Sequence, residues 1–210
     1  MKFKQKVALL AMMMALPLVA SAGDSGVVYG QLSTNGLGVG YAASVKGDWA
    51  ARGQFNSFKM AFSGDVGDFG ANSKLTADIN LQSILLLADW YPTTTGFRVS
   101  GGVVVNNNKV TITGTGKVNN KDATVNGEIK MSDSLSPYLG LGYSTRPKDA
   151  KGLGFNFDLG VLFQSPKVSL TADGALIQQS DIDSQLKTMQ DAADKLKIFP
   201  VLGLGVSYAF

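Results

Sequence analysis

The feature that most constrains this chain is an alternation of bulky apolar residues with small or polar ones. It is clearest from Leu153 to Gln164 (LGFNFDLGVLFQ), where one face carries only Leu, Phe and Val and the other carries Gly, Asn, Asp, Gly, Leu and Gln. A period of two is that of a β-strand, whose successive side chains point to opposite faces. The water-facing side of a soluble sheet usually carries Lys, Glu and Thr, whereas Gly, Asn and Asp suit a cramped interior. The pattern therefore predicts a narrow barrel with a polar inside and an apolar outside.

The alternation recurs along the chain and predicts eight strands. We expect them near residues 27–34, 36–44, 49–62, 73–91, 97–113, 127–144, 153–172 and 200–210. An even number of strands, with short inner turns and longer outer connections, is typical of single-chain bacterial barrels. With both termini in the periplasm, the short turns fall at 45–48, 92–96 and 145–152, and the long connections at 63–72, 114–126 and 173–199. The expected fold is all-β, an eight-stranded antiparallel transmembrane β-barrel.

Two segments depart from the simplest version of this pattern. The strands at 73–91 and 153–172 exceed the roughly 9–11 residues that cross a membrane, so we expect them to project outward as a rim. After Asn56 the face that had been polar becomes apolar, with Phe58, Met60 and Phe62. We expect a β-bulge near Ser57 to cause this change of face.

The beginning of the chain predicts export. Residues 1–22 contain three lysines, a short apolar stretch from Val7 to Leu18 and the small residues Ala20-Ser21-Ala22, which together are typical of a cleaved signal peptide. Residues 23–210 then form the barrel domain. Three of the 19 basic residues lie in the leader, so the remaining basic residues balance the 16 acidic ones. This balance argues against nucleic-acid binding.

The end of the chain predicts a location in the bacterial outer membrane. Apolar residues alternate up to a terminal aromatic residue, and this resembles the last strand of outer-membrane barrels, which the barrel assembly machinery recognises. We expect Val206, Tyr208 and Phe210 to form that signal. Aromatic rings favour the headgroup layer, and six of them lie at the expected inner ends of the strands: Trp49, Trp90, Tyr91, Phe97, Tyr143 and Tyr208.

One segment has helical periodicity. From Asp181 to Ile198, apolar residues recur at spacings of four and three: Ile182, Leu186, Met189, Ala193 and Leu196. The order of strands places this short amphipathic helix in the last external loop. It could form a lid over the barrel mouth, or it could lie against the rim or the headgroup layer.

The polar interior is the candidate site. Its expected lining, read as a possible solute pathway, is Arg52, Asn56, Asp78, Gln82, Arg98 and Asp158. Eight strands leave an interior just wide enough for side chains, and buried charges must pair because an unpaired one is costly. The two Arg and two Asp residues could form a salt-bridged plug, or they could line a narrow polar path.

The composition excludes several kinds of chemistry. The chain has no His and no Cys, which rules out a Ser-His-Asp triad, a His–Cys zinc site and thiol chemistry. Ser and Asp alone offer no base that titrates near neutral pH. We therefore expect no enzymatic activity, no metal and no cofactor.

The second half of the chain contains a series of distinctive segments in a fixed order: Ser136–Tyr143 (SPYLGLGY), Gly152–Gly160 (GLGFNFDLG), Ser165–Thr171 (SPKVSLT), the helical segment and Pro200-Val201. With these segments it resembles the carbapenem-associated outer-membrane protein (CarO-like) family of small bacterial barrels. The resemblance implies an eight-stranded outer-membrane barrel with a role in the passage of small amino acids, often basic, and of carbapenems.

These observations predict a non-enzymatic outer-membrane barrel that forms a narrow, porin-like pathway for small solutes such as amino acids. The alternative is a closed structural or surface-interaction barrel that acts through its external loops. The expected partners are outer-membrane lipid, lipopolysaccharide and the barrel assembly machinery, with small amino acids as possible solutes.

Overall fold

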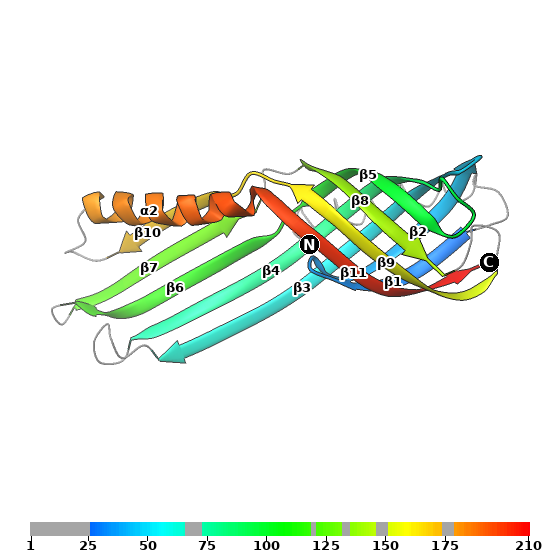
Figure 1. Ribbon diagram of the computed structural model, residues 1–210. Helices are drawn as coiled ribbons and strands as arrows, with labels where there is room; N and C mark the ends of the chain where they lie inside the picture. The colour runs from blue at the N-terminus through cyan, green and yellow to red at the C-terminus, as the bar shows by residue number, and fades with distance from the viewer. Residues whose placement is uncertain (1–25, 66–72, 119–120, 132–134, 146–150, 174–178) are drawn as a thin grey trace.

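Eight antiparallel strands close into a barrel in the computed structural model, which describes residues 26–65, 73–118, 121–131, 135–145, 151–173 and 179–210 (Figure 1). The barrel strands are β1 (Gly26–Ser33), β2 (Gly36–Lys46), β3 (Trp49–Asp65), β4 (Lys74–Trp90), β5 (Phe97–Asn106), β8 (Leu135–Ser144), β9 (Gly152–Phe163) and β11 (Ile198–Ala209). The barrel closes where β11 pairs with β1, with Ala209 opposite Val27. The predicted fold class is therefore confirmed. The predicted signal peptide lies outside the described residues.

The same sheet continues from one side of the barrel as an open extension. Three further strands, β6 (Lys109–Val118), β7 (Lys121–Lys130) and β10 (Lys167–Asp173), follow β4 in the order β3-β4-β6-β7-β10. The part of β4 outside the barrel, residues 74–80, pairs with β6 and is its distal part. Its proximal part, residues 83–90, pairs with β5 inside the barrel wall. We call β6, β7, β10 and the distal parts of β3 and β4 the extension sheet. Figure 1 shows it projecting beyond the barrel, away from the C-terminus.

The projecting rim was predicted, but its strands are interrupted. The predicted strand 97–113 is β5 followed by β6, with a break at residues 107–108. The predicted strands 127–144 and 153–172 are likewise each divided into an extension part and a barrel part. Each break lies where a strand leaves the curved barrel and joins the open sheet.

The bulge predicted near Ser57 is wrong. The pairing of β3 with β4 runs without a shift from Trp49 opposite Trp90 to Asp65 opposite Lys74, and the irregularity of this region lies instead in β2, between Ser44 and Lys46. Because the register is continuous, Phe58 and Met60 point to the same side as Asn56.

The two sides of the strands exchange polarity at the base of the extension sheet. In the barrel the outward row Phe55–Ile84–Val105 is apolar, and the inward neighbours of Phe55 on β3 are the polar residues Gln54 and Asn56. In the extension sheet the outward side carries residues such as Lys59 and Asp78, and the inward side carries Met60, Phe62 and Ile79 among others. Lipid surrounds a barrel, but water surrounds the part that has left the membrane. The inversion therefore marks the edge of the membrane.

The helix α2 (Gln179–Asp194) covers part of the inward side of the extension sheet (Figure 1). The methyl carbon of Met189 lies against Gly127 of β7. Gln190 donates from Nε2 to the carbonyl of Pro166 at 3.0 Å and accepts from the amide of Val168 at 3.1 Å, which ties the helix to the start of β10. Of the two predicted positions for the helix, the structure has the one against the rim.

The helix ends earlier than the sequence predicts. The prediction extended it to Ile198, but a 3-10 turn, η2 (Lys195–Lys197), follows Asp194, and Ile198 already pairs with Phe163 as the first residue of β11. No helix in the described part of the chain is long and apolar enough to cross a membrane.

Aromatic rings gather at the end of the barrel that holds the C-terminus. Trp49 stacks on Trp90 with ring centroids 6.4 Å apart, and Tyr41 lies 6.4 Å from Phe210. The adjacent strands pair Phe97 with Tyr143 at the same end. This distribution agrees with the girdle predicted for the inner ends of the strands.

Candidate functional site

Four charged side chains form a closed cluster inside the barrel, and we call them the charged cluster: Arg52 of β3, Asp89 of β4, Arg98 of β5 and Asp158 of β9. All four are buried, with 0–5% of their surface exposed. Gly142, paired with Arg98 on the neighbouring strand β8, provides space for the guanidinium, which a Cβ at that position would meet. The inward glycines thus allow long polar side chains to lie across a narrow interior.

Arg52 connects both carboxylates of the charged cluster. Its Nε lies 2.8 Å from Oδ2 of Asp89, and its Nη2 donates to Oδ1 of Asp89 at 3.0 Å. Its Nη1 donates to both carboxylate oxygens of Asp158 at 3.2 Å. Arg98 donates to Oδ1 of Asp158 at 2.7 Å, and its Nε lies 3.8 Å from Asp89. The four formal charges sum to zero, so every buried charge of the cluster is compensated by an opposite one.

The sequence prediction for this site is partly wrong. Arg52, Arg98 and Asp158 lie inside, as does Asn56, which is fully buried and donates to the hydroxyl of Ser83 at 3.2 Å. Asp78 is exposed on the outward side of the extension sheet, opposite Ala61 and Thr111. Gln82 also points outward, opposite Ser57 at the base of that sheet. Both errors follow from the inversion of polarity, because a polar outward side was interpreted as a polar interior.

Asp89, which takes the place predicted for Asp78, was missed for a related reason. It follows the run Ile84-Leu-Leu-Leu-Ala88, in which both faces of the strand are apolar. The sequence pattern therefore does not show which face points into the barrel. Only the pairing of β4 with β3, which sets Asp89 opposite Ala50, places it inside. The count of charges gave no signal for Asp89, because Asp78 and Asp158 already balanced the two Arg residues in the predicted interior.

A chain of amide and hydroxyl groups extends from the charged cluster along the interior. Gln31 donates to Oδ2 of Asp158 at 3.0 Å. From the same strand, Tyr29 donates to Gln54 of β3 at 2.8 Å, and Gln54 donates to Asn56 at 2.6 Å. These bonds hold the polar side chains in fixed positions across the lumen.

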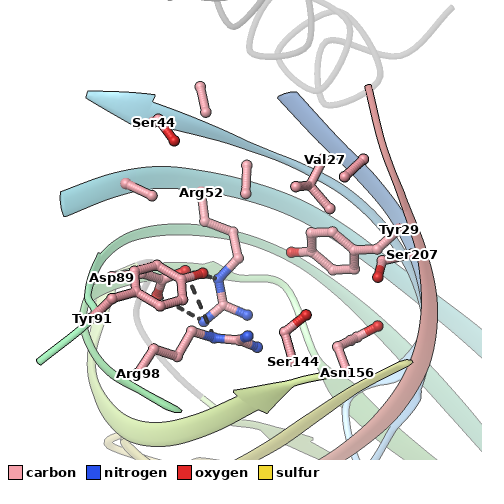
Figure 2. A pocket seen from close by; sticks show the side chains of 14 residues that line it. Val27, Tyr29, Ser44, Arg52, Asp89, Tyr91, Arg98, Ser144, Asn156 and Ser207 are labelled. Carbon is pink, nitrogen blue, oxygen red and sulfur yellow. Dashed lines mark hydrogen bonds and ion pairs between the residues drawn. The ribbon is translucent and has the colours of Figure 1, made fainter. Parts of the chain in front are cut away.

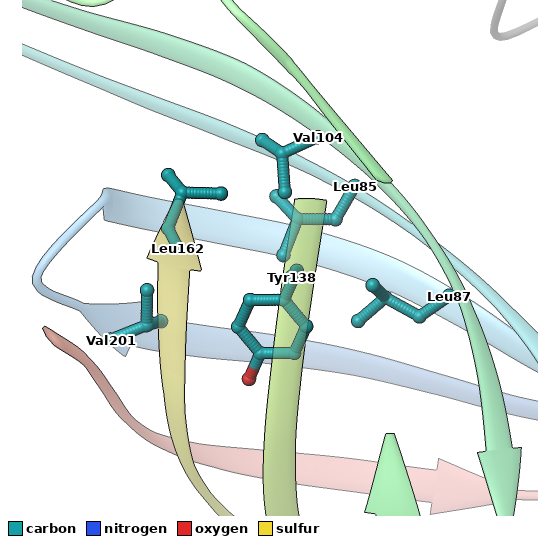
Figure 3. Close-up of a cluster of buried hydrophobic side chains, with 6 residues drawn as sticks. All are labelled: Leu85, Leu87, Val104, Tyr138, Leu162 and Val201. Carbon is teal, nitrogen blue, oxygen red and sulfur yellow. The ribbon is translucent and has the colours of Figure 1, made fainter. Parts of the chain in front are cut away.

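Beyond the charged cluster, toward the extension sheet, six buried apolar side chains pack together inside the barrel (Figure 3). We call this group the apolar plug, and it consists of Leu85, Leu87, Val104, Tyr138, Leu162 and Val201. Their exposed fractions range from 0 to 6%. Above the plug, Asn106 donates to Gln164 at 3.2 Å, and Gln164 donates to the carbonyl of Leu196 at 2.9 Å. Buried side chains thus line the interior from the charged cluster to the 3-10 turn η2.

On the opposite side of the charged cluster, a small vestibule opens toward the C-terminal end of the barrel (Figure 2). Its volume is about 50 Å³, and small residues such as Ala43, Ala50 and Ser207 line it together with Arg52 and Arg98. Asn156 points into it, and neither atom of the Asn156 amide has a hydrogen-bond partner although the residue is only 6% exposed. Tyr91 lies at its mouth, where burial raises the pKa of the phenol. A space of this size holds a few water molecules.

The predicted assembly signal lies on the lipid-facing surface. Val206, Tyr208 and Phe210 are 57%, 49% and 45% exposed and point outward from β11. Phe210 also exchanges two backbone hydrogen bonds with Gly26, at 3.0 and 3.2 Å. Recognition of these residues by the assembly machinery stays a prediction.

The described residues contain no group of three or more His, Cys, Asp or Glu side chains that could hold a metal ion. The chemistry available in the interior is that of a neutral network of ion pairs and amides. Such a network can bind water or a small polar solute at its open end.

Solved structures with a similar fold come from outer-membrane proteins. The crystal structure of CarO2 from Acinetobacter baumannii is 21% identical with a TM-score of 0.60, covering 89% of this chain and 98% of that one. The structure of CarO from the same organism is 23% identical with a TM-score of 0.57, covering 88% of this chain and 97% of that one. No protein-family model matches the sequence, and a comparison with curated proteins gives no significant match.

The predicted resemblance therefore holds for the fold over most of the chain. The apolar outer surface of the barrel and this likeness both support the predicted location in the bacterial outer membrane. The chain has the outer-membrane barrel fold of the CarO structures.

Proposed function

We propose that this protein is a closed outer-membrane barrel that anchors the extension sheet and α2 at the cell surface. The observation that carries the proposal is the apolar plug, whose six side chains leave no more than 6% of any one of them exposed. Ions and polar solutes would have to leave water to pass such a layer. The proposal includes no catalysis, since the chain has neither His nor Cys.

The position of α2 also supports this proposal. A lid has to lie over the barrel mouth, but α2 is bound to β10 through Gln190 and covers β7 through Met189. Removing the helix would therefore expose the extension sheet and leave the apolar plug in place.

Conductance in planar bilayers and swelling of liposomes in glycine test the proposal. The wild-type protein and a variant lacking residues 179–194 should both be closed. A variant with Val104→Gly, Tyr138→Ala and Leu162→Gly truncates three of the six side chains of the apolar plug and should conduct, which makes it the positive control. Single-channel currents or glycine-driven swelling with the wild-type protein would refute the closed barrel.

A second candidate, the narrow pathway for small amino acids, is favoured by the vestibule. Guanidinium and carboxylate groups lie next to each other there, beside the unpartnered amide of Asn156. These groups complement the carboxylate and ammonium of a zwitterion. Passage would require the apolar plug to open transiently. A variant with Arg52→Ala and Arg98→Ala should then pass small cations faster than the wild-type protein, whereas the closed barrel predicts no passage by either.

A further inference from the structure

One long edge of the extension sheet pairs with no further strand. Within the extension sheet the order is β10-β7-β6-β4-β3, and Figure 1 shows β3 as the outermost strand on the side away from α2. The pairing of β2 with β3 ends where Leu37 lies opposite Ser57, whereas β3 continues to Asp65. In the described part of the chain, no strand pairs with this side of β3 beyond Ser57. We call Phe58–Asp65 the open edge.

Every second residue of the open edge points its backbone amide and carbonyl away from β4. The carbonyl of Gln82 accepts from the amide of Asn107, on the side of β4 that faces away from β3. Ser57 lies directly opposite Gln82, and two opposite residues of an antiparallel pair either bond to each other or both point away. The backbone of Ser57 therefore points away from β4, and so does that of every second residue beyond it: Lys59, Ala61, Ser63 and Asp65.

The open edge lacks most of the features that keep such edges from pairing. Exposed edges are commonly short, or they carry Pro, several charges or a bulge, or another element covers them. The open edge contains no Pro and a single lysine, and its register with β4 continues without a bulge. Residues 59–65 are all exposed. The helix α2 contacts β7 and β10, at the other end of the strand order. The open edge is therefore accessible.

On the outward side, the open edge carries opposite charges at its two ends. These are Lys59 and Asp65. On β4, Lys74 lies opposite Asp65, and Asp78 lies diagonal to Lys59. None of these four side chains takes part in the ion pairs of the described residues. The four charges sum to zero, so the open edge would select a partner by the positions of its charges and not by its net charge.

The inward side of the open edge is apolar. Met60 and Phe62 are 40% and 54% exposed. A Cβ added to Gly64, the next residue on this side, would meet nothing within 4 Å, so there is room for a bulky residue opposite it. A strand added here with β-branched residues on the inward side would remove Met60 and Phe62 from water.

A second copy of this chain in the same membrane cannot supply that strand in the antiparallel direction. Copies in one membrane are related by an axis along the membrane normal. In both copies β3 rises from the membrane at a tilt of roughly 40°, so the two strands cannot run in opposite directions. Antiparallel pairs are the more stable ones. The partner that fits the open edge is therefore a segment of a different polypeptide.

We propose that the open edge binds an extended segment of another polypeptide as an added antiparallel strand. That segment has a basic residue opposite Asp65, an acidic residue opposite Lys59, and apolar residues at alternate positions on the side of Met60 and Phe62. The proposal rests on the proposed display of the extension sheet outside the membrane and not on the closed lumen. Conductance by the wild-type protein would therefore leave it intact.

The test measures binding of a fluorescent, end-blocked peptide, Lys-Val-Thr-Val-Thr-Val-Glu, to the full-length protein in detergent micelles by fluorescence anisotropy. The first control peptide has the same composition, with its two charged residues exchanged. Two further peptides carry two N-methyl groups each. One is methylated on both threonines, whose amides would face β3, and the other on the first and last valines, whose amides would face away.

We expect the charge-exchanged peptide to bind about tenfold more weakly, because two opposite-charge pairs become like-charge pairs. Methylation of the threonines should weaken binding by at least about tenfold, since two backbone hydrogen bonds are lost, whereas methylation of the valines should have little effect. Hydrogen exchange measured by NMR should slow at the amides of the residues that point to the added strand, Lys59, Ala61 and Ser63. It should stay unchanged at Met60 and Phe62, which point to β4.

Two variants of the chain test the location. Ala61→Pro removes an amide that points away from β4, so the variant should fold and bind the peptide at least about tenfold more weakly. Ala61→Thr keeps the amide and should bind like the wild-type protein. A variant with Lys59→Glu and Asp65→Lys should reverse the preference between the original and the charge-exchanged peptides.

Equal binding of the original and the charge-exchanged peptides by the wild-type protein would overturn the proposal. Equal binding of the two methylated peptides would also overturn it, because it would indicate adsorption to the apolar side without a new strand. Unchanged hydrogen exchange at Lys59, Ala61 and Ser63 in the presence of bound peptide would do the same. If Ala61→Pro does not fold, as judged by the gel mobility of unheated samples, the variant with Lys59→Glu and Asp65→Lys decides the matter.

Discussion

Replacing Asp89 by Asn should destabilise the barrel strongly, because it leaves the charged cluster with two cations and one anion. The side chain keeps its shape but loses the charge that faces Arg52 at 2.8 and 3.0 Å and Arg98 at 3.8 Å. The carboxylate also accepts a 2.6 Å hydrogen bond from Ser100. Asp89 is 0% exposed, so water cannot replace the lost charge. Removing one partner of a buried ion pair costs about 3–5 kcal/mol.

The free energy of unfolding can be measured by urea titration of the protein folded into phospholipid vesicles. Trp49 and Trp90, the only two tryptophans of the chain, report on folding from the end of the barrel that holds the vestibule. With a urea dependence of about 2 kcal/mol per molar, the midpoint should fall by roughly 2 M. Gel mobility of unheated samples gives a second measure of the folded fraction.

Asp78→Asn is the matched control, since it makes the same chemical change on the exposed side of the extension sheet. Its effect should stay within about 0.5 kcal/mol. A double variant with Arg52→Gln and Asp89→Asn should lose less than the sum of the two single variants, because the two side chains are coupled. Equal midpoints for Asp89→Asn and Asp78→Asn would show that the ion-pair argument is wrong.

Three further predictions concern packing and ionisation. Leu162→Ala should reduce the free energy of unfolding by about 2–5 kcal/mol in the same titration, because Leu162 is fully buried in the apolar plug. Gly102→Ala should destabilise the barrel by about 1–3 kcal/mol, since its Cβ would meet the backbone carbonyl of Leu86, whereas Gly53→Ala, which meets nothing within 4 Å, should not. The hydrogen bond from Lys197 at 2.8 Å lowers the pKa of Asp194, so NMR titration should find that pKa below the usual value of about 3.9 and Lys197→Ala should raise it. Because the folded-state pKa is the lower one, the stabilisation by Asp194 is present above the unfolded-state pKa and is lost as the pH falls through the folded-state pKa.

The sequence predicts the barrel well because each membrane-crossing strand has two environments that differ sharply. Runs such as Leu153–Phe163 allow one register only, since a shift by one residue would put phenylalanines inside and Asp158 in lipid. The sequence left open whether Asn35-Gly36 forms a hairpin turn or lies inside one longer strand. The structure has the turn between β1 and β2, and Gly36 has a positive φ of 105°.

The wrongly placed residues lie where the two sides of a strand do not differ in polarity, or where the polar side faces outward. Asp78 and Gln82 belong to a stretch of β4 with the same alternation as a barrel strand but with the environments exchanged. No local pattern distinguishes a polar side that faces the lumen from a polar side that faces water. Asp89 lies beyond a run that is apolar on both faces, because the apolar plug lies inside while lipid lies outside. Only the pairing of distant strands resolves these cases.

The extension sheet is built from three separate excursions of the chain, which return in turn to the barrel between β3 and β4, between β5 and β8, and between β9 and β11. Its coding sequence is therefore discontinuous, and recombination could not add, remove or exchange the extension sheet as a single segment. Lengthening one excursion within a strand would shift its pairing with both neighbours and turn the lysines of that strand to the opposite side. Tolerated changes of length are thus confined to the connections between the strands, and surface variation in this protein should arise by substitution on the paired strands and by insertion at their tips.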